Sequence, residues 1–226
     1  YNDSSTDYTQ IGTSAYNSKY NDNAYVGYMY GTTGASTYEE THANVNSSTI
    51  KTKVDSWYEE NMKDTEYEQY ISDTLFCNDR SFRSSNTGTG IGDVYTSYNY
   101  ASTGTGGVNL KCAQQNDRFT VSDEVIGNGS LTYPVGLLTD DEGYLAGGSS
   151  SNSGYYLYTG NLYWTMSPSG FDGSSAFVRR VYYYGNVDGS YIVYLSYGVR
   201  PVLSLKSGSL TQGQGTILDP YTLSGN

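Results

Sequence analysis

The segment Ser167–Tyr197 is rich in the residue types that proteins use to bind other molecules. Between Phe177 and Tyr197 it holds six tyrosines and two arginines among Ser, Asn and Asp, and 167–197 contains no Lys, Glu, Gln, Met or Trp. Tyrosine supplies a large contact area with little rotamer entropy to lose, and arginine adds directed hydrogen bonds and stacking. The composition predicts a recognition surface. The alternative is a sheet with tyrosine on its exposed face, because tyrosine also has a high strand propensity.

The alternation of residues along "AFVRRVYYYG" favours recognition. In a strand spanning Phe177–Tyr184, each face would carry a valine, an arginine and at least one tyrosine, so neither face is cleanly apolar. This pattern is not that of an ordinary half-buried strand, and we expect the segment to contact a ligand directly. The expected contacts are Phe171, Phe177, Arg179, Arg180, Tyr182, Tyr184, Tyr191, Tyr194 and Tyr197.

The residues that could support catalysis or metal binding are few. His42 is the single imidazole and lies in "EETHAN", which we expect to be an exposed loop. No nucleophile elbow, phosphate loop or dinucleotide fingerprint is present. Asp140, Asp141 and Glu142 could form an acid pair or a calcium site, but acids in the first turn of a helix are also favoured by its dipole. We predict a non-enzymatic protein without catalytic residues, metal or cofactor.

Cys77 and Cys112 are the two cysteines of the chain, and two cysteines with one histidine are too few for a structural zinc site. They form either a disulfide or two separate buried thiols. The composition, rich in Tyr, Ser, Asn and Gly, is typical of extracellular proteins and favours the disulfide. The triplet "NDR" occurs near each cysteine, at 78–80 and 116–118, where it can supply ion pairs and hydrogen bonds that brace loops.

Two helices are predicted by capping and periodicity. Ser47 or Ser48 can cap a helix whose apolar positions are Ile50, Val54, Trp57, Tyr58 and Met62, with Lys51 among the charged residues of the opposite face. In "LLTDDEGYLAGG", Thr139 and Glu142 form a capping box, and Gly147 stands where a C-terminal cap belongs.

The remaining elements read as short strands. Tyr- and Val-rich runs separated by Gly, Asn and Asp turns follow residue 155, with "GNVDG" able to close a hairpin, whereas 84–110 reads as a long loop. A first half with helices followed by a run of short strands predicts an α+β fold with antiparallel sheet. We expect one domain over 1–226, with 1–46 as an N-terminal segment packing on it.

The composition restricts the partners. The 226 residues carry a net charge of −11, which argues against nucleic acid because phosphate binding requires a concentrated basic surface. No run of 18 apolar residues exists, so we expect no direct membrane insertion in this fragment. The chain starts at Tyr1 without a signal peptide, which we interpret as a processed product or a piece of a longer protein. An extracellular or cell-surface location is expected.

Two segments resemble the formylglycine-generating-enzyme branch of the C-type lectin fold. "LLTDDEGYLAGG" is similar to its helix "L-P-T-E-A-E-W-E-Y-A", and "YGVRPVLSL" to its closing "G-F-R" strand. The branch includes the variable proteins of diversity-generating retroelements, in which adenine-directed mutagenesis rewrites codons near the C-terminus. The residue set of 167–197 is compatible with that process, so the resemblance implies a variable ligand-binding region there. The enzyme's paired cysteines and the calcium motifs of sugar-binding lectins are missing.

A resemblance over nearly the whole chain involves "NDNAYVGYMYG", "FCNDRS", "LKCAQQNDRFTV" and "YWTMSPSGF". These stretches resemble ectodomains of pilin-like surface proteins from Gram-positive gut bacteria. Such proteins carry a prepilin-type N-terminal helix, which implies self-assembly through a segment that this chain lacks. Two functions follow: recognition of an unknown protein or glycan ligand, or a structural subunit of a pilus or surface layer that uses the tyrosine-rich face for assembly.

Overall fold

The computed structural model describes residues 10–81, 93–94, 108–216 and 218–223 of the chain. It has a mixed α+β architecture of mostly short strands and few helices, as the sequence predicts. Most of the loop expected over 84–110 lies outside the described residues.

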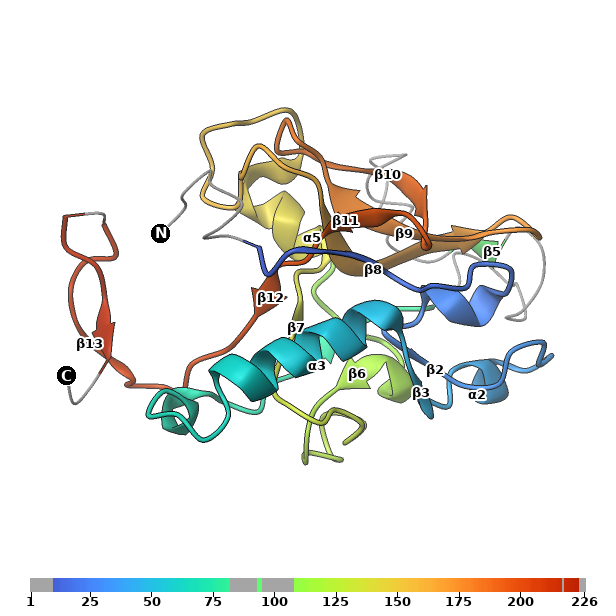
Figure 1. Ribbon diagram of the computed structural model, residues 1–226, viewed down its shortest axis with the longest axis horizontal. Coiled ribbons are helices and arrows are strands. Elements are labelled where there is room, and N and C mark those ends of the chain that lie inside the picture. Colours follow the sequence, from blue (N-terminus) through green and yellow to red (C-terminus); the bar gives the residue numbers. More distant parts are fainter. Residues whose placement is uncertain (1–9, 82–92, 95–107, 217, 224–226) are drawn as a thin grey trace.

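The largest sheet is built mainly from the C-terminal part of the chain (Figure 1). Its path ends at the N-terminal strand β1, which pairs with β11, and the short strand β5 adds to β8. All pairings are antiparallel except β11 with β8, which meet at Gly198 and Tyr163. The strands in order are β1 (Thr13–Ala15), β11 (Ser196–Gly198), β8 (Tyr163–Phe171), β9 (Ala176–Val181) and β10 (Val187–Ile192), with β5 (Asp93–Val94) beside β8.

Four two-stranded pairs connect the rest of the described chain. They are β2 (Met29–Tyr30) with β3 (Asn46–Ser47), β4 (Phe76–Cys77) with β6 (Arg118–Phe119), β7 (Gly136–Leu137) with β12 (Pro201–Val202), and β13 (Leu210–Gln212) with β14 (Thr222–Leu223). Short helical turns are η1 (Asn23–Val26), α2 (Tyr38–Thr41), η2 (Glu68–Tyr70), η3 (Gln115–Asp117), α5 (Asp140–Gly143) and η4 (Tyr144–Gly148).

The long helix α3 (Thr49–Asn61) begins where its cap predicts. The Ser48 hydroxyl accepts a hydrogen bond from the Lys51 amide, and the helix buries Ile50, Val54 and Tyr58. The prediction that Lys51 lies on an exposed face is wrong. Its side chain is fully buried and its ammonium pairs with Asp55 one turn along the helix, so burial extends around the helix beyond the apolar stripe.

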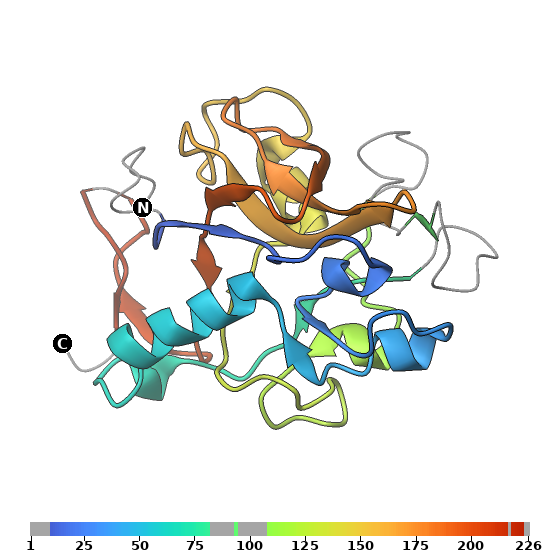
Figure 2. The same cartoon turned by 45° about the vertical axis from the view of Figure 1, so that its right-hand side comes forward.

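Two apolar clusters lie on opposite sides of the large sheet. The larger joins α3 to Trp164 and Val178 of the sheet, and the smaller packs the α5 region against Tyr163 and Val181. In both general views α3 lies below the sheet, and α5 lies on the side of β8 away from α3 (Figure 1 and Figure 2). Strand β9 is therefore covered on both faces, and five of its six residues are buried.

The predicted capping box and hairpin are both present. Thr139 and Glu142 exchange hydrogen bonds at the start of α5, and Gly147 has a φ of +120° near the end of the following π turn. The hairpin of β9 and β10 turns through Tyr182–Gly185, where Gly185 donates to the Tyr182 carbonyl at 2.8 Å, so the turn precedes most of "GNVDG". Among the described residues, no helix combines the length and apolar character needed to cross a lipid bilayer.

Candidate ligand-binding surface

Arg180 lies in a cage of tyrosine rings on one side of β9. Its guanidinium carbon is 3.2 Å from the ring centroid of Tyr191, 4.5 Å from that of Tyr197 and 5.1 Å from that of Tyr182. The arginine is only 5% exposed, and it forms no ion pair with any described side chain. Cation–π attraction to the ring faces is therefore the interaction that holds the guanidinium among the described side chains.

The cage continues into the core of the protein. Tyr197 contacts Tyr191 at 5.9 Å and the buried Trp164 at 4.8 Å between ring centroids. Burial is the main cause that raises the pKa of Tyr197, and the Arg180 cation opposes the shift. The tyrosine-rich segment is therefore anchored from beneath by an aromatic stack.

Arg179, the neighbour of Arg180, faces the opposite side of the sheet. Its Nε lies 3.2 Å from an oxygen of Asp140, the first residue of α5, and both side chains are buried. Successive residues of a strand point to opposite faces, so two adjacent arginines serve two different clusters. The interaction attaches α5 to the sheet, and Asp140 does more than favour the helix dipole.

The turn that joins β9 to β10 carries three consecutive tyrosines, named here the tyrosine turn (Tyr182, Tyr183 and Tyr184). Their ring centroids lie 4.0 Å, 4.2 Å and 5.6 Å apart, so the rings touch one another. Tyr183 is 38% and Tyr184 54% exposed, whereas Tyr182 is half-buried over Arg180. The turn therefore presents an aromatic tip to solvent above the buried cage.

A neighbouring loop holds this turn by its main chain. The Asn152 amide donates to the Tyr184 carbonyl at 3.0 Å, and the Tyr155 hydroxyl donates to the Gly185 carbonyl. Gly185 has a φ of +92°, and a Cβ there would lie 2.3 Å from the Asn152 carbonyl oxygen. Only glycine fits at this position, and the supporting contacts leave the tips of Tyr183 and Tyr184 uncovered.

The nine predicted contacts differ widely in exposure. Tyr184 and Tyr194 are exposed, whereas Phe171, Arg179 and Arg180 are buried. The mixed faces of "AFVRRVYYYG" do not expose the strand part of this stretch, because apolar clusters cover β9 from both sides. The remaining four, Phe177, Tyr182, Tyr191 and Tyr197, are half-buried.

Three exposed tyrosines were missed by the sequence analysis. Tyr183 was not among the predicted contacts, but the strand ends at Val181 and the turn exposes it. Tyr156, 66% exposed, follows the residue that supports the turn. Tyr20, from the N-terminal segment, stacks on Tyr194 at 4.8 Å beside the start of β9. The turn chemistry around Gly185 is the one signal that could have found Tyr183.

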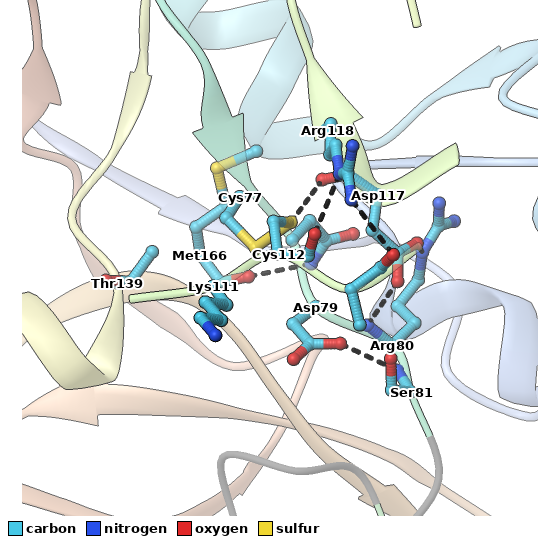
Figure 3. The surroundings of a disulfide bond; sticks show 12 residues. Cys77, Asp79, Arg80, Ser81, Lys111, Cys112, Asp117, Arg118, Thr139 and Met166 are labelled. Atoms are coloured by element: carbon cyan, nitrogen blue, oxygen red, sulfur yellow. Dashed lines mark hydrogen bonds and ion pairs between the residues drawn. A yellow bond between two sulfur atoms is a disulfide. The ribbon is translucent and has the colours of Figure 1, made fainter. Parts of the chain in front are cut away.

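The two cysteines form the predicted disulfide. Cys77 and Cys112 are bonded with a Cα separation of 5.8 Å. Pairing of β4 with β6 sets Cys77 opposite Arg118 and brings the two "NDR" triplets side by side (Figure 3). Arg118 donates to the Cys112 and Ala113 carbonyls, which braces the second cysteine.

Arg80 and Asp117 join the two triplets by a buried ion pair. The Arg80 Nε lies 2.7 Å from an oxygen of Asp117, and neither side chain is exposed. Further donations from Arg80 reach the Met29 carbonyl at 2.9 Å and Asn44 at 3.0 Å. The structural interpretation of "NDR" is confirmed. His42 is buried in the same region against Tyr38, contrary to the expected exposed loop, and burial lowers its pKa to about 2.

A cavity of about 170 Å³ lies between the disulfide and the start of α5. Cys77, Lys111, Asp79, Asp141 and Glu142 are among its lining residues. Burial, with smaller contributions from Asp79 and Glu142, raises the pKa of Asp141 to about 6. Within the described ranges, no three His, Cys, Asp or Glu side chains are grouped so as to hold a metal ion.

No protein family model, curated protein or solved structure matches this chain. The geometry of its own residues therefore carries the functional argument.

Proposed function

We propose that this chain is a non-enzymatic domain displayed outside the cell that binds a protein or glycan ligand through the tyrosine turn. The observation that carries the proposal is the exposure of Tyr183 and Tyr184 on a turn whose main chain is held by Asn152 and Tyr155. Exposed aromatic side chains on a pre-ordered support bind with little further loss of entropy.

The buried part of the segment supports this role from below. Arg180 gathers Tyr182, Tyr191 and Tyr197 around one cation, which limits the motion of the rings under the turn. Clustered tyrosines near an arginine are the typical composition of binding hot spots. In this proposal Tyr183 and Tyr184 contact the ligand directly, and Arg179 and Arg180 position the surface.

The proposal extends to the fold and the location. A capped α5 followed by short antiparallel strands supports a C-type-lectin-like arrangement, with 167–197 as the variable region. The formed disulfide supports an oxidising, extracellular compartment.

A structural subunit of a pilus or surface layer is the second candidate. Its support is the Tyr20–Tyr194 pair, a second exposed aromatic site. It lies beside the start of β9, whereas the tyrosine turn follows the last residue of β9. Two separate exposed aromatic sites on one chain are compatible with a head-to-tail assembly, in which different surfaces of neighbouring copies meet.

The test begins with a printed array of host glycans and purified surface proteins, probed with the whole chain. The affinity of each bound partner is then measured for the variant Tyr183→Ser/Tyr184→Ser. The matched control is Tyr67→Ser/Tyr221→Ser, which replaces two exposed tyrosines outside the turn. We expect the turn variant to lose at least about tenfold in affinity, as for hot-spot tyrosines, and the control to lose less than about twofold.

Two results would contradict recognition by the turn. One is array binding that both variants retain equally. The other is concentration-dependent self-association of the wild-type chain, seen by light scattering, that Tyr183→Ser/Tyr184→Ser abolishes. That second result would favour assembly.

A further inference from the structure

A polar hollow lies at the N-terminal end of α3, separate from the tyrosine turn. It has a volume of about 380 Å³ and is lined mainly by serine and threonine hydroxyls from three segments of the chain. Ser14 and Ser18 come from the N-terminal segment, Ser47 from β3, and Thr52 and Ser56 from α3. Seven of its ten described lining residues are serine or threonine, so the surface offers several hydroxyl groups to a polyhydroxylated ligand.

A second hollow of about 350 Å³ adjoins the first at Tyr30. Lys19, Thr32, Thr33 and Asn46 are among its lining residues. The half-buried ring of Tyr30 borders both spaces and packs edge-on against Tyr25, with 5.3 Å between centroids. An aromatic face between two sets of polar groups can pack on the C–H face of a sugar ring while the polar groups bind its hydroxyls.

The charged side chains among the lining residues of the hollows are both lysines. Lys19 and Lys53 line them, and no Asp or Glu occurs among their described lining residues, although the chain carries a net charge of −11. Neither lysine forms an ion pair with a described residue. The N-terminus of the 13-residue helix α3 adds the positive end of its dipole. The region is a local attractor for anions.

Asn17 is an independent sign of an unfilled binding position. It lines the first hollow and is only 3% exposed, yet its Nδ2 has no hydrogen-bond partner among the described residues. A buried amide donor without a partner destabilises the folded protein, and a hydrogen bond to a ligand oxygen would offset that cost.

We propose that the two hollows form one site for an acidic saccharide. Lys53, together with the helix dipole, binds a carboxylate or sulfate group, Lys19 binds the next acidic group along the chain, and Tyr30 packs against a sugar ring. The serine and threonine hydroxyls and Asn17 bind the hydroxyl oxygens. The site shares no residue with the tyrosine turn. An experiment can therefore contradict saccharide binding at the hollows without contradicting ligand binding by the turn, and the reverse.

The test uses the whole chain and a hyaluronan hexasaccharide, in which uronic acid alternates with N-acetylglucosamine. A chitin hexasaccharide serves as the neutral probe and inorganic sulfate as the bare anion. Amide chemical shifts are followed by NMR titration. We expect saturable shifts at the hollow with hyaluronan and at least about tenfold weaker binding of the other two probes. The chitin hexasaccharide lacks the charge-assisted contacts, and sulfate lacks the contacts of the sugar rings and hydroxyls.

The lysines are tested by Lys19→Gln/Lys53→Gln. A matched control is Lys63→Gln/Lys206→Gln, which makes the same charge change at two lysines away from the hollows. We expect the first variant to weaken hyaluronan binding at least about tenfold and the control less than about twofold. Equal loss in the two variants, equal binding of the neutral hexasaccharide or of sulfate, or no shifts at the hollow would each overturn the proposal.

Discussion

Arg80 and Arg180 are both buried arginines, but different kinds of neighbour surround them. Arg80 has a carboxylate partner in Asp117 and donates directed hydrogen bonds to carbonyl and amide oxygens. Arg180 lies among tyrosine ring faces and has no described ion-pair partner. Hydrogen bonds to a charged group depend strongly on direction, whereas attraction to a ring face tolerates several orientations.

The difference separates a part that holds the fold from a part that carries a surface. Around Arg80 the ion pair and the disulfide join segments from residue 29 to residue 118. The Arg180 guanidinium, in contrast, contacts the ring of Tyr182, which in turn contacts Tyr184 in the exposed tyrosine turn. Four variants test this comparison.

Replacing Arg80 has the largest expected effect. Arg80→Met leaves the buried Asp117 carboxylate without its cation, which we expect to lower the free energy of unfolding by about 3–5 kcal/mol. Urea denaturation at neutral pH measures the change. Arg118→Met is the control, because Arg118 is less buried and, among the described residues, donates to main-chain carbonyls and pairs with no carboxylate. Equal losses in the two variants would remove the special role of the Arg80–Asp117 pair.

The disulfide comes next. Cys77→Ser/Cys112→Ser releases a link between residues 35 apart in sequence, and we expect a loss of about 3–4 kcal/mol from the greater freedom of the unfolded chain. Reduced wild-type protein should show the same unfolding midpoint in urea as the variant. A reduced protein as stable as the oxidised one would show that the ion pair alone holds the two "NDR" triplets together.

Arg180→Met is expected to cost less than Arg80→Met. The variant loses attraction to three rings but leaves no buried anion among the described side chains, so we expect a loss of at most about 2 kcal/mol. Near-ultraviolet circular dichroism should change as well, because the tyrosines lose their common cation. A loss as large as that of Arg80→Met would mean that Arg180 also holds the fold.

The smallest effect concerns Asp141 beside the disulfide. Its pKa is raised in the folded protein from 3.8 to about 6, so the folded state keeps a proton that the unfolded state has already released. The stability from this group is complete below pH 3.8 and is lost as the pH rises through about 6. Asp141→Asn should therefore gain stability relative to wild type between about pH 4 and pH 7.

Thermal unfolding at a series of pH values measures this gain. The exposed Asp219→Asn serves as the control and should follow the wild-type profile. An Asp141→Asn protein whose stability stays parallel to wild type over the whole range would contradict the raised pKa.

Local signals predicted the local structure correctly. Ser48 and the Thr139–Glu142 box mark two helix starts from neighbouring residues alone, and the turn residues around Gly185 mark a hairpin. The cysteine pair was predicted from composition and count. The helix starts and the hairpin each depend on a few residues that are close in sequence. The cysteine pair required only a choice between a disulfide and two free thiols.

Burial on distant elements could not be predicted in the same way. Lys51 and His42 look exposed in sequence, but packing buries both, with Asp55 one helical turn from Lys51 and Tyr38 against His42. The exposure of the individual candidate contacts could not be predicted for the same reason. Arg179 is buried because Asp140, 39 positions earlier, lies against it, and no alternation within β9 shows this.

The attachment of the tyrosine turn has an evolutionary consequence. The hydrogen bonds that attach the turn end on main-chain carbonyls of Tyr182, Tyr184, Gly185 and Asn186, and the side-chain hydrogen bond of Tyr184 stays within the turn, with Tyr183. Side chains at 183 and 184 can therefore change over generations with little penalty to folding, while Gly185 stays invariant. A lineage could thus explore new ligands at two neighbouring codons and inherit the same scaffold each time.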